Sequence, residues 1–217
     1  MVTTLPMQTV PSSALEGSRT RNQADIERVR STQQGSLDAF NMLVLDYQDQ
    51  VYNQAYWILG DDAAAEDAAQ EAFFRAYSKI HTFDGDSFRA WILRITTNYC
   101  LDRIRRAKRH PLISLELPGK DDDDWIEDSP WFIDHQASPE QLAEQDDCRT
   151  LINQCLMQLK PKDRAPIILV DIQGLDYQEA AAVLGMPLGS LKSRLCRARG
   201  KLLQAISQVP GADAILN

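Results

Sequence analysis

Long hydrophobic runs are missing from this chain of 217 residues. No apolar stretch approaches the roughly 20 residues that a helix needs to cross a bilayer, so we expect no membrane contact. Residues 1–24 are rich in Ser, Thr and Pro and lack the apolar core of a secretion signal. The sequence therefore predicts an unstructured N-terminal extension and a cytoplasmic protein.

Metal-binding patterns are also missing. The chain has four cysteines and three histidines, and no two cysteines show Cys-x-x-Cys spacing. Cys148 and Cys155 could share one face of a helix, but buried free thiols are favoured there over a metal or redox site. We expect no metal ion, no cofactor and no catalytic residue.

Strand-like alternation and internal repeats are absent, and apolar residues recur at helical spacing over most of the chain. Pro and Gly interrupt this spacing between residues 111 and 147. The sequence thus predicts an all-α fold of two small helical domains joined by an acidic flexible linker. The predicted segments are residues 25–110 and 148–208 for the domains, 111–147 for the linker and 209–217 for a tail. One predicted helix begins after Ser36. The other predicted helices cover residues 63–80, 88–109, 151–159 and 163–172.

The net charge of −8 hides an asymmetry along the chain. Residues 111–147 carry 12 acidic side chains and one basic side chain, whereas residues 148–217 carry nine basic and five acidic ones. The acidity therefore belongs to the linker, and the C-terminal domain is basic. This distribution is compatible with a nucleic acid as the partner.

The segment 176–202 has the pattern of two helices joined by a tight turn. Asp176 and Glu179 can form a capping box, and Gly185 suits the left-handed conformation that ends a helix. The second helix has five basic and no acidic residues between positions 189 and 201. A helix that is merely solvated would usually mix both signs, so the pattern favours a helix-turn-helix that binds the DNA major groove. The apolar stripe of this second helix comprises Leu191, Leu195, Ala198 and Leu202.

A second basic cluster ends the helix predicted at residues 88–109, where five basic residues lie between positions 103 and 109. Cations near a helix C-terminus are favoured by the helix dipole, but five in seven positions exceed what capping requires. Phe88, Asn98 and Tyr99 lie upstream. Basic residues beside aromatic ones suit single strands or extruded bases, although these aromatic rings could equally belong to the core.

Three blocks of the chain resemble, in order, the extracytoplasmic-function (group IV) sigma factors of bacterial RNA polymerase. Residues 66–77 look like the helix through which region 2 of this family binds the core enzyme. Residues 83–106 look like the −10 element segment of region 2, and residues 177–199 look like region 4. The resemblance implies that the N-terminal domain binds core polymerase and opens the −10 element, and that the C-terminal helix-turn-helix binds the −35 element.

The resemblance also implies which residues make these contacts. Core polymerase would contact Asp67, Gln70, Glu71 and Phe74. The −10 DNA would contact Phe83, Ser87, Arg94, Asn98, Asp102, Arg103, Arg105 and Arg106, with the loop from Phe83 to Ser87 around an extruded base. The −35 DNA would contact Ser190, Lys192, Ser193, Arg194, Cys196 and Arg197. An anti-sigma factor is a candidate further partner.

Two other interpretations stay open at the level of the sequence. A stand-alone helix-turn-helix repressor or activator would bind DNA without polymerase, so binding assays with and without core enzyme separate it from a sigma factor. An enzyme such as a nuclease is disfavoured, because the acidic run at residues 121–124 lies in a Pro-rich linker without a scaffold to hold a metal ion.

Overall fold

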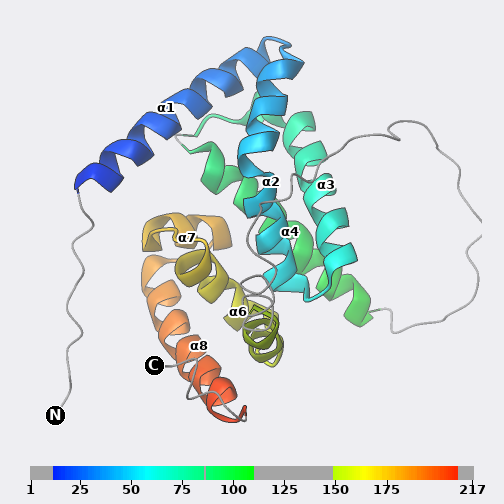
Figure 1. The fold of residues 1–217 in the computed structure, drawn as a ribbon, viewed down its shortest axis with the longest axis vertical. Coiled ribbons are helices and arrows are strands. Elements are labelled where there is room, and N and C mark those ends of the chain that lie inside the picture. The colour runs from blue at the N-terminus through cyan, green and yellow to red at the C-terminus, as the bar shows by residue number, and fades with distance from the viewer. Residues whose placement is uncertain (1–11, 86, 110–148, 210–217) are drawn as a thin grey trace, which may run out of the picture.

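The structure is a computed structural model that describes residues 12–85, 87–109 and 149–209. Every regular element in these ranges is helical, as predicted (Figure 1). The first helix group comprises α1 (Ser12–Gln33), α2 (Leu37–Leu59), α3 (Asp62–Ser78), the 3₁₀ helix η1 (Ile80–Thr82) and α4 (Phe88–Arg109). The second helix group comprises a helix at residues 149–157, α6 (Pro161–Ile167), the π-helical segment η2 (Ile168–Ile172), α7 (Tyr177–Leu184) and α8 (Leu188–Ser207). The predicted linker, Cys148 and the tail from residue 210 lie outside the described ranges.

Helix α1 begins at Ser12, so the structure differs from the predicted unstructured extension at residues 1–24. Contacts with α2 stabilise the second half of this polar helix. The Tyr47 hydroxyl donates a hydrogen bond to the buried Asp25 carboxylate (O···O 2.5 Å). Arg21 donates to the Asp46 backbone carbonyl (3.2 Å), and Arg28 pairs with the Asp46 carboxylate. Charge-assisted bonds of this kind stabilise a helix that has little apolar surface of its own.

Polar caps and a glycine define the helix ends of the first group, and the helix start at Ser36 is as predicted. Ser36 caps α2 by accepting a hydrogen bond from the Ala39 N–H (3.3 Å), and Asp61 caps α3 through the Ala64 N–H (2.8 Å). Gly60 ends α2 in the left-handed conformation with φ 79°. The buried face of α3 consists of alanines, which let α3 lie close to α2 and α4.

The helix-turn-helix has the predicted form. Asp176 and Glu179 make the reciprocal capping box of α7, and Gly185 ends α7 with φ 61°. The single helix predicted at residues 163–172 is instead α6 followed by η2. Pro166 lies inside this segment and cannot donate a backbone hydrogen bond, which favours a local change of helix type.

Two ion pairs connect α8 to the rest of the second helix group. Arg199 makes a two-point contact with Asp171 (3.0 and 2.5 Å), and Lys201 donates to the largely buried Asp163 carboxylate (2.6 Å). The bond from Lys201 lowers the pKa of Asp163, and the bond to Asp171 raises the pKa of Arg199. Two of the basic residues of α8 therefore have structural partners within the chain.

The two helix groups dock on each other through shared apolar clusters. In one cluster Phe88 and Ile92 of α4 belong with Val183 of α7 and Leu191 of α8. The other joins residues from the end of α2, such as Ile58, to residues of the second group. Helix α7 lies against α4, and η2 lies against α2. This shared burial stabilises the second group, which is too short to bury much apolar surface alone.

Cysteine burial follows the prediction where it can be seen. Cys100 and Cys155 are buried free thiols, and Cys196 is exposed on α8. Burial raises the pKa of Cys100 to about 12, so this thiol is a packing group. Among the residues described, none of the helices combines the length and apolar character of a transmembrane span.

Replacing Gly60 with Ala should destabilise the protein more than the same change at Gly185. Both glycines have positive φ, so each substitution costs about 1 kcal/mol of backbone strain. Only at Gly60 does the new Cβ approach a neighbour, because Met157 Sδ lies 2.7 Å from its position. We expect a loss of about 1–2 kcal/mol for G60A and about 1 kcal/mol for G185A in urea denaturation. Equal losses would show that the Met157 side chain can move aside without lowering the free energy of unfolding.

Replacing Lys201 with Gln should weaken the attachment of α8. The pKa of Asp163 is lowered in the folded state, so the stability that it contributes is present above the unfolded-state pKa of about 4 and is lost as the pH falls through the folded-state value. We expect K201Q to lose about 1 kcal/mol at pH 7 and less at pH 3.

The matched control is Arg197→Gln, because Arg197 is exposed and its guanidinium bonds to the Ser193 carbonyl of its own helix (3.2 Å). We expect R197Q to change stability by less than about 0.5 kcal/mol. Thermal unfolding of both variants at the two pH values measures the difference. Indistinguishable melting at pH 7 would mean that the Lys201–Asp163 pair stabilises nothing.

Candidate nucleic-acid interface

The outward face of α8 carries small polar and basic side chains. Its inner face buries Leu191, Leu195 and Ala198, so the apolar stripe determines which side chains point outward. The six residues that the sequence assigns to −35 DNA lie together on this helix. Five of them are exposed and Arg194 is half-buried; the exposed ones are Ser190, Lys192, Ser193, Cys196 and Arg197.

Local contacts organise this face. The Ser193 hydroxyl donates to the Ser190 carbonyl (3.1 Å), and Arg197 Nε donates to the Ser193 carbonyl (3.2 Å). The Lys192 ammonium lies 6.0 Å from the centroid of the Tyr177 ring on α7. Hydroxyls and two cations on one helical face can bond to base edges and phosphates in the major groove.

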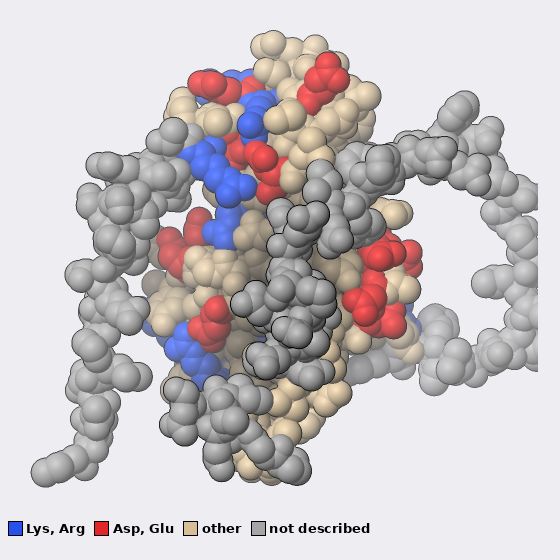
Figure 2. Space-filling model, in the orientation of Figure 1, with Lys and Arg blue, Asp and Glu red and all other residues tan. Residues whose placement is uncertain are grey.

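The exposed face of α3 is acidic and apolar. Asp67, Gln70, Glu71 and Phe74 follow the spacing i, i+3, i+4, i+7 and therefore share one side of the helix. Phe74 is 69% exposed, and Glu71 is half-buried. Acidic side chains also gather where α3 begins (Figure 2), at Asp61, Asp62 and Glu66. An open aromatic ring beside carboxylates suits a protein partner that has basic side chains.

The outward face of α4 is basic and polar. Arg94, Asn98, Asp102 and Arg105 are exposed and share one side of the helix at the spacing i, i+4, i+8, i+11. Asp102 accepts a hydrogen bond from Arg105 (2.6 Å), so its carboxylate orients a guanidinium within this face. Arg106 is also exposed. Most of the residues that the sequence assigns to −10 DNA are thus brought together.

The loop before α4 differs from the assignment at one residue. The Phe83 side chain is buried and packs edge-on against Trp91, with ring centroids 5.3 Å apart, so it supports the loop and does not face outward. Ser87 is half-buried, and its hydroxyl accepts the Ala90 N–H (3.2 Å) as a helix cap. Sequence reasoning missed Gln33 of α1, which donates to the Phe83 carbonyl (3.1 Å) and anchors the loop.

One ion pair links α3 to α4, and a second lies within α3 at the spacing i, i+4. Asp67 accepts a hydrogen bond from Arg103 (3.3 Å), and Glu71 accepts one from Arg75 (2.5 Å). Burial disfavours the Arg103 cation, but hydrogen bonds to Tyr99 and Asp67 more than offset this and raise the pKa of Arg103. Residues assigned separately to polymerase and to DNA are therefore in contact.

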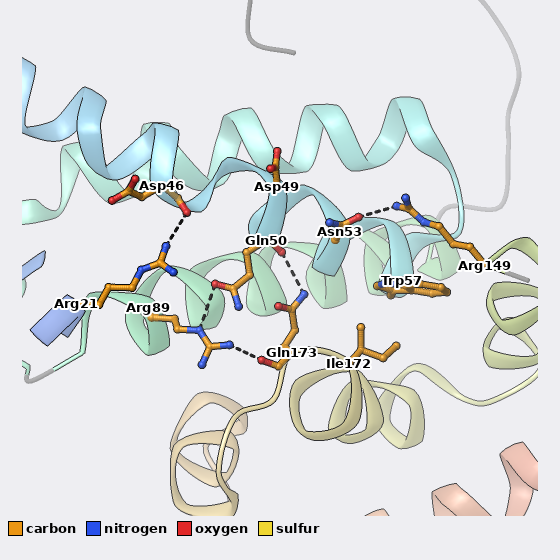
Figure 3. A pocket seen from close by; sticks show the side chains of 10 residues that line it. All are labelled: Arg21, Asp46, Asp49, Gln50, Asn53, Trp57, Arg89, Arg149, Ile172 and Gln173. Carbon is orange, nitrogen blue, oxygen red and sulfur yellow. Dashed lines mark hydrogen bonds between the residues drawn. The ribbon is translucent and has the colours of Figure 1, made fainter. Parts of the chain in front are cut away.

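A cleft of about 850 Å³ lies between the two helix groups (Figure 3). Arg89 of α4 donates to the Gln50 side chain (3.2 Å) and to the Gln173 backbone carbonyl, and the Gln173 side chain donates to the Gln50 carbonyl (3.2 Å). Arg149 donates to the Asn53 side chain (2.7 Å). These polar contacts join the two groups at the edge of their apolar interface.

Both halves of the chain match known families. The Sigma-70 region 2 family matches residues 43–110, and the Sigma-70, region 4 family matches residues 149–202. The ECF RNA polymerase sigma factor SigW of Bacillus subtilis is 33% identical over 177 residues, which cover 81% of this chain and 93% of SigW. The ECF RNA polymerase sigma-E factor of Escherichia coli is 34% identical over 185 residues, which cover 82% of this chain and 90% of that protein. SigE of Mycolicibacterium smegmatis is 34% identical over 169 residues, which cover 78% of this chain and 62% of SigE.

Two solved structures are similar over most of the chain. CnrH in complex with the cytosolic domain of CnrY has a TM-score of 0.62 and 26% identity, and the match covers 86% of this chain and 99% of CnrH. RpoE of Bartonella quintana in complex with the anti-sigma factor NepR has a TM-score of 0.59 and 26% identity, and the match covers 80% of this chain and 100% of RpoE. The two family matches and these relatives show that the chain belongs to the ECF family of RNA polymerase sigma factors.

Proposed function

We propose that this chain is the promoter-specificity subunit of a bacterial RNA polymerase. It binds the core enzyme through the exposed face of α3, the −10 element through α4 and the loop before it, and the −35 element through α8. One observation carries the proposal: a single chain presents an acidic and apolar face on α3 together with basic and polar faces on α4 and α8. A stand-alone regulator would need only the last of these faces.

At the −35 element, α8 enters the major groove. Lys192 and Arg197 bind guanine edges or phosphates, and the serine hydroxyls of Ser190 and Ser193 bond to either kind of group. Cys196 lies between the cations and is exposed. Its small uncharged side chain permits a close approach of the helix to a base.

At the −10 element, the loop before α4 holds an extruded base and Asn98 contacts a base edge. Arg94, Arg105 and Arg106 bind phosphates of the strand. Binding an extruded base and a single strand more tightly than duplex shifts the melting equilibrium toward the open state. The chain itself makes and breaks no bond, because the polymerase carries out the chemistry in the cytoplasm.

Simultaneous binding of both elements requires the two helix groups to separate. Elements centred about 25 base pairs apart lie about 85 Å apart along B-form DNA, whereas α7 is packed on α4 in the structure. The chain between residues 109 and 149 has a contour length of about 130 Å, which exceeds this distance. The docked structure is therefore the form that precedes promoter binding.

An anti-sigma factor is the second partner that we propose. RpoE of Bartonella quintana, which is similar to this chain, forms a complex with the anti-sigma factor NepR. The cleft between the helix groups combines cations from three elements, Arg21, Arg89 and Arg149, with the exposed Ile172. An acidic and apolar segment of such a partner fits these side chains and would hold the groups together.

Assays with and without core enzyme distinguish a sigma factor from a stand-alone regulator. Transcript starts mapped after overexpression identify the promoter elements, and gel shifts and run-off transcription on that promoter are then measured with and without core enzyme. We expect promoter-specific transcripts only when both proteins are present. DNA binding by the chain alone, with no transcript when core is added, would favour the regulator.

Replacing Lys192 or Arg197 with Ala should weaken −35-dependent transcription. A residue that reads a base should contribute about 1–3 kcal/mol and determine the preference at one position, whereas a phosphate contact should affect all sequences alike and reduce the salt slope by about one. Run-off transcription and binding across a salt series distinguish the two roles. Arg30→Ala, an exposed cation on α1, is the control and should behave as wild type. Unchanged activity and binding in both K192A and R197A would contradict the placement of α8.

A further inference from the structure

Tyr177 is the first residue of α7, and none of the DNA contacts proposed above involves it. Its side chain is 39% exposed, so the ring is not needed to fill the core. Helices α7 and α8 lie side by side (Figure 1), and the Lys192 ammonium of α8 lies over this ring, 6.0 Å from its centroid. At this separation the face of a ring still attracts a cation. Tyr177 therefore contacts a side chain to which we assign a −35 contact.

The Tyr177 side chain is restrained at both of its ends. At the backbone end, Asp176 accepts hydrogen bonds from two N–H groups in the first turn of α7 (2.7 and 2.8 Å), which fixes the start of the helix. At the other end, Arg199 is bonded to Asp171, and a hydrogen bond with Tyr177 adds to the effect of Asp171 in raising the pKa of Arg199. The ring is thus held between the cap of α7 and an anchored guanidinium.

The contact between the ring and Lys192 leaves the positive charge available to DNA. Two other cations of α8 are paired with carboxylates of the second helix group, which neutralise them. The Tyr177 ring carries no charge. Two carboxylates stand near it in the sequence, and both are bonded within the cap: Asp176 accepts the N–H groups named above, and Glu179 accepts the Asp176 N–H (3.1 Å). An uncharged ring can orient a cation without competing with a phosphate or a base edge for its charge.

An oriented lysine binds DNA at a lower entropic cost. The lysine side chain has four rotatable bonds, and fixing it on a partner removes much of its rotamer freedom. A contact that already restricts the side chain in the free protein lowers this cost. It also restricts the ammonium to the DNA groups on one side of the groove, which favours one base position over its neighbours.

We propose that Tyr177 is a positioning residue for the −35 element, because its ring holds the Lys192 ammonium in the orientation in which it contacts DNA. This inference rests on the proposed function, since it needs Lys192 to contact the −35 element. The ring acts through Lys192 alone. Its contribution should therefore vanish when Lys192 is removed and persist when Arg197, a cation of the same face five positions further along α8, is removed.

The first test uses the complex of the full chain with core polymerase and a fluorescein-labelled duplex that carries the mapped −35 element and ends before the −10 element. Fluorescence anisotropy across a salt series measures binding. Tyr177→Leu removes the ring, so we expect binding about twofold to fivefold weaker, with an unchanged salt slope because no charge is lost. Tyr177→Phe keeps the ring and should bind as wild type. Equal losses in Y177L and Y177F would assign the effect to the hydroxyl, and either that result or unchanged binding of Y177L overturns the inference.

The second test repeats Y177L in the backgrounds Lys192→Ala and Arg197→Ala, with the same complex and duplex. We expect Y177L to weaken binding no further in K192A and to weaken it by the full twofold to fivefold in R197A. A general loss of helix stability would lower binding equally in both backgrounds. Co-elution of each variant with core enzyme shows that it is folded. If K192A weakens binding and Y177L adds its full loss to it, only this inference fails. If K192A binds as wild type, the proposed role of Lys192 at the −35 element fails with it.

Discussion

Apolar packing between the two helix groups is the interaction on which the rest of this structure depends. The second group is short, and it gains much of its buried surface by sharing clusters with α2 and α4. Each helix turns its apolar side toward these clusters. The polar side of each helix is therefore directed outward, and those outward sides include the faces of α3, α4 and α8 to which we assign the proposed contacts.

The same packing sets a requirement for activity. In the proposed function, promoter binding needs the groups apart, so the free energy of DNA and polymerase contacts has to exceed that of the shared clusters. Polar contacts between described residues reinforce the interface, such as those of Arg89 and Gln173 with Gln50. An interface held mainly by apolar burial is stable in isolation, and a partner can still replace it with equivalent contacts of its own.

The ion pairs of the structure differ in strength. On α8, Arg199 and Lys201 are anchored to carboxylates of the second group, and Lys192 and Arg197 stay exposed on the outer face. Asp67 pairs with Arg103 between α3 and α4, Glu71 pairs with Arg75 within α3, and both pairs are partly exposed. Because exposed pairs are weak, these arginines can change partners, whereas a cation bonded to the largely buried Asp163 is held more firmly.

Local chemistry made much of the fold predictable. The caps at Ser36 and Asp176 and the left-handed glycine Gly185 stand where the sequence predicts them. The start of α1 was not predictable, because its stability comes from Asp25 and Arg28 contacts with α2. The sequence also did not predict the π-helical segment η2, because the spacing of apolar residues alone does not distinguish a short π-helix from an α-helix.

The sequence by itself determined the family, the all-α class and the helix faces, because short-range periodicity, capping and charge spacing are properties of neighbouring residues. Only the tertiary structure decided that Phe83 is buried, that Asp67 pairs with Arg103, and that the two helix groups are docked. These features join residues that are distant along the chain or lie on different helix faces. Their geometry follows from how whole helices pack, which local spacing does not encode.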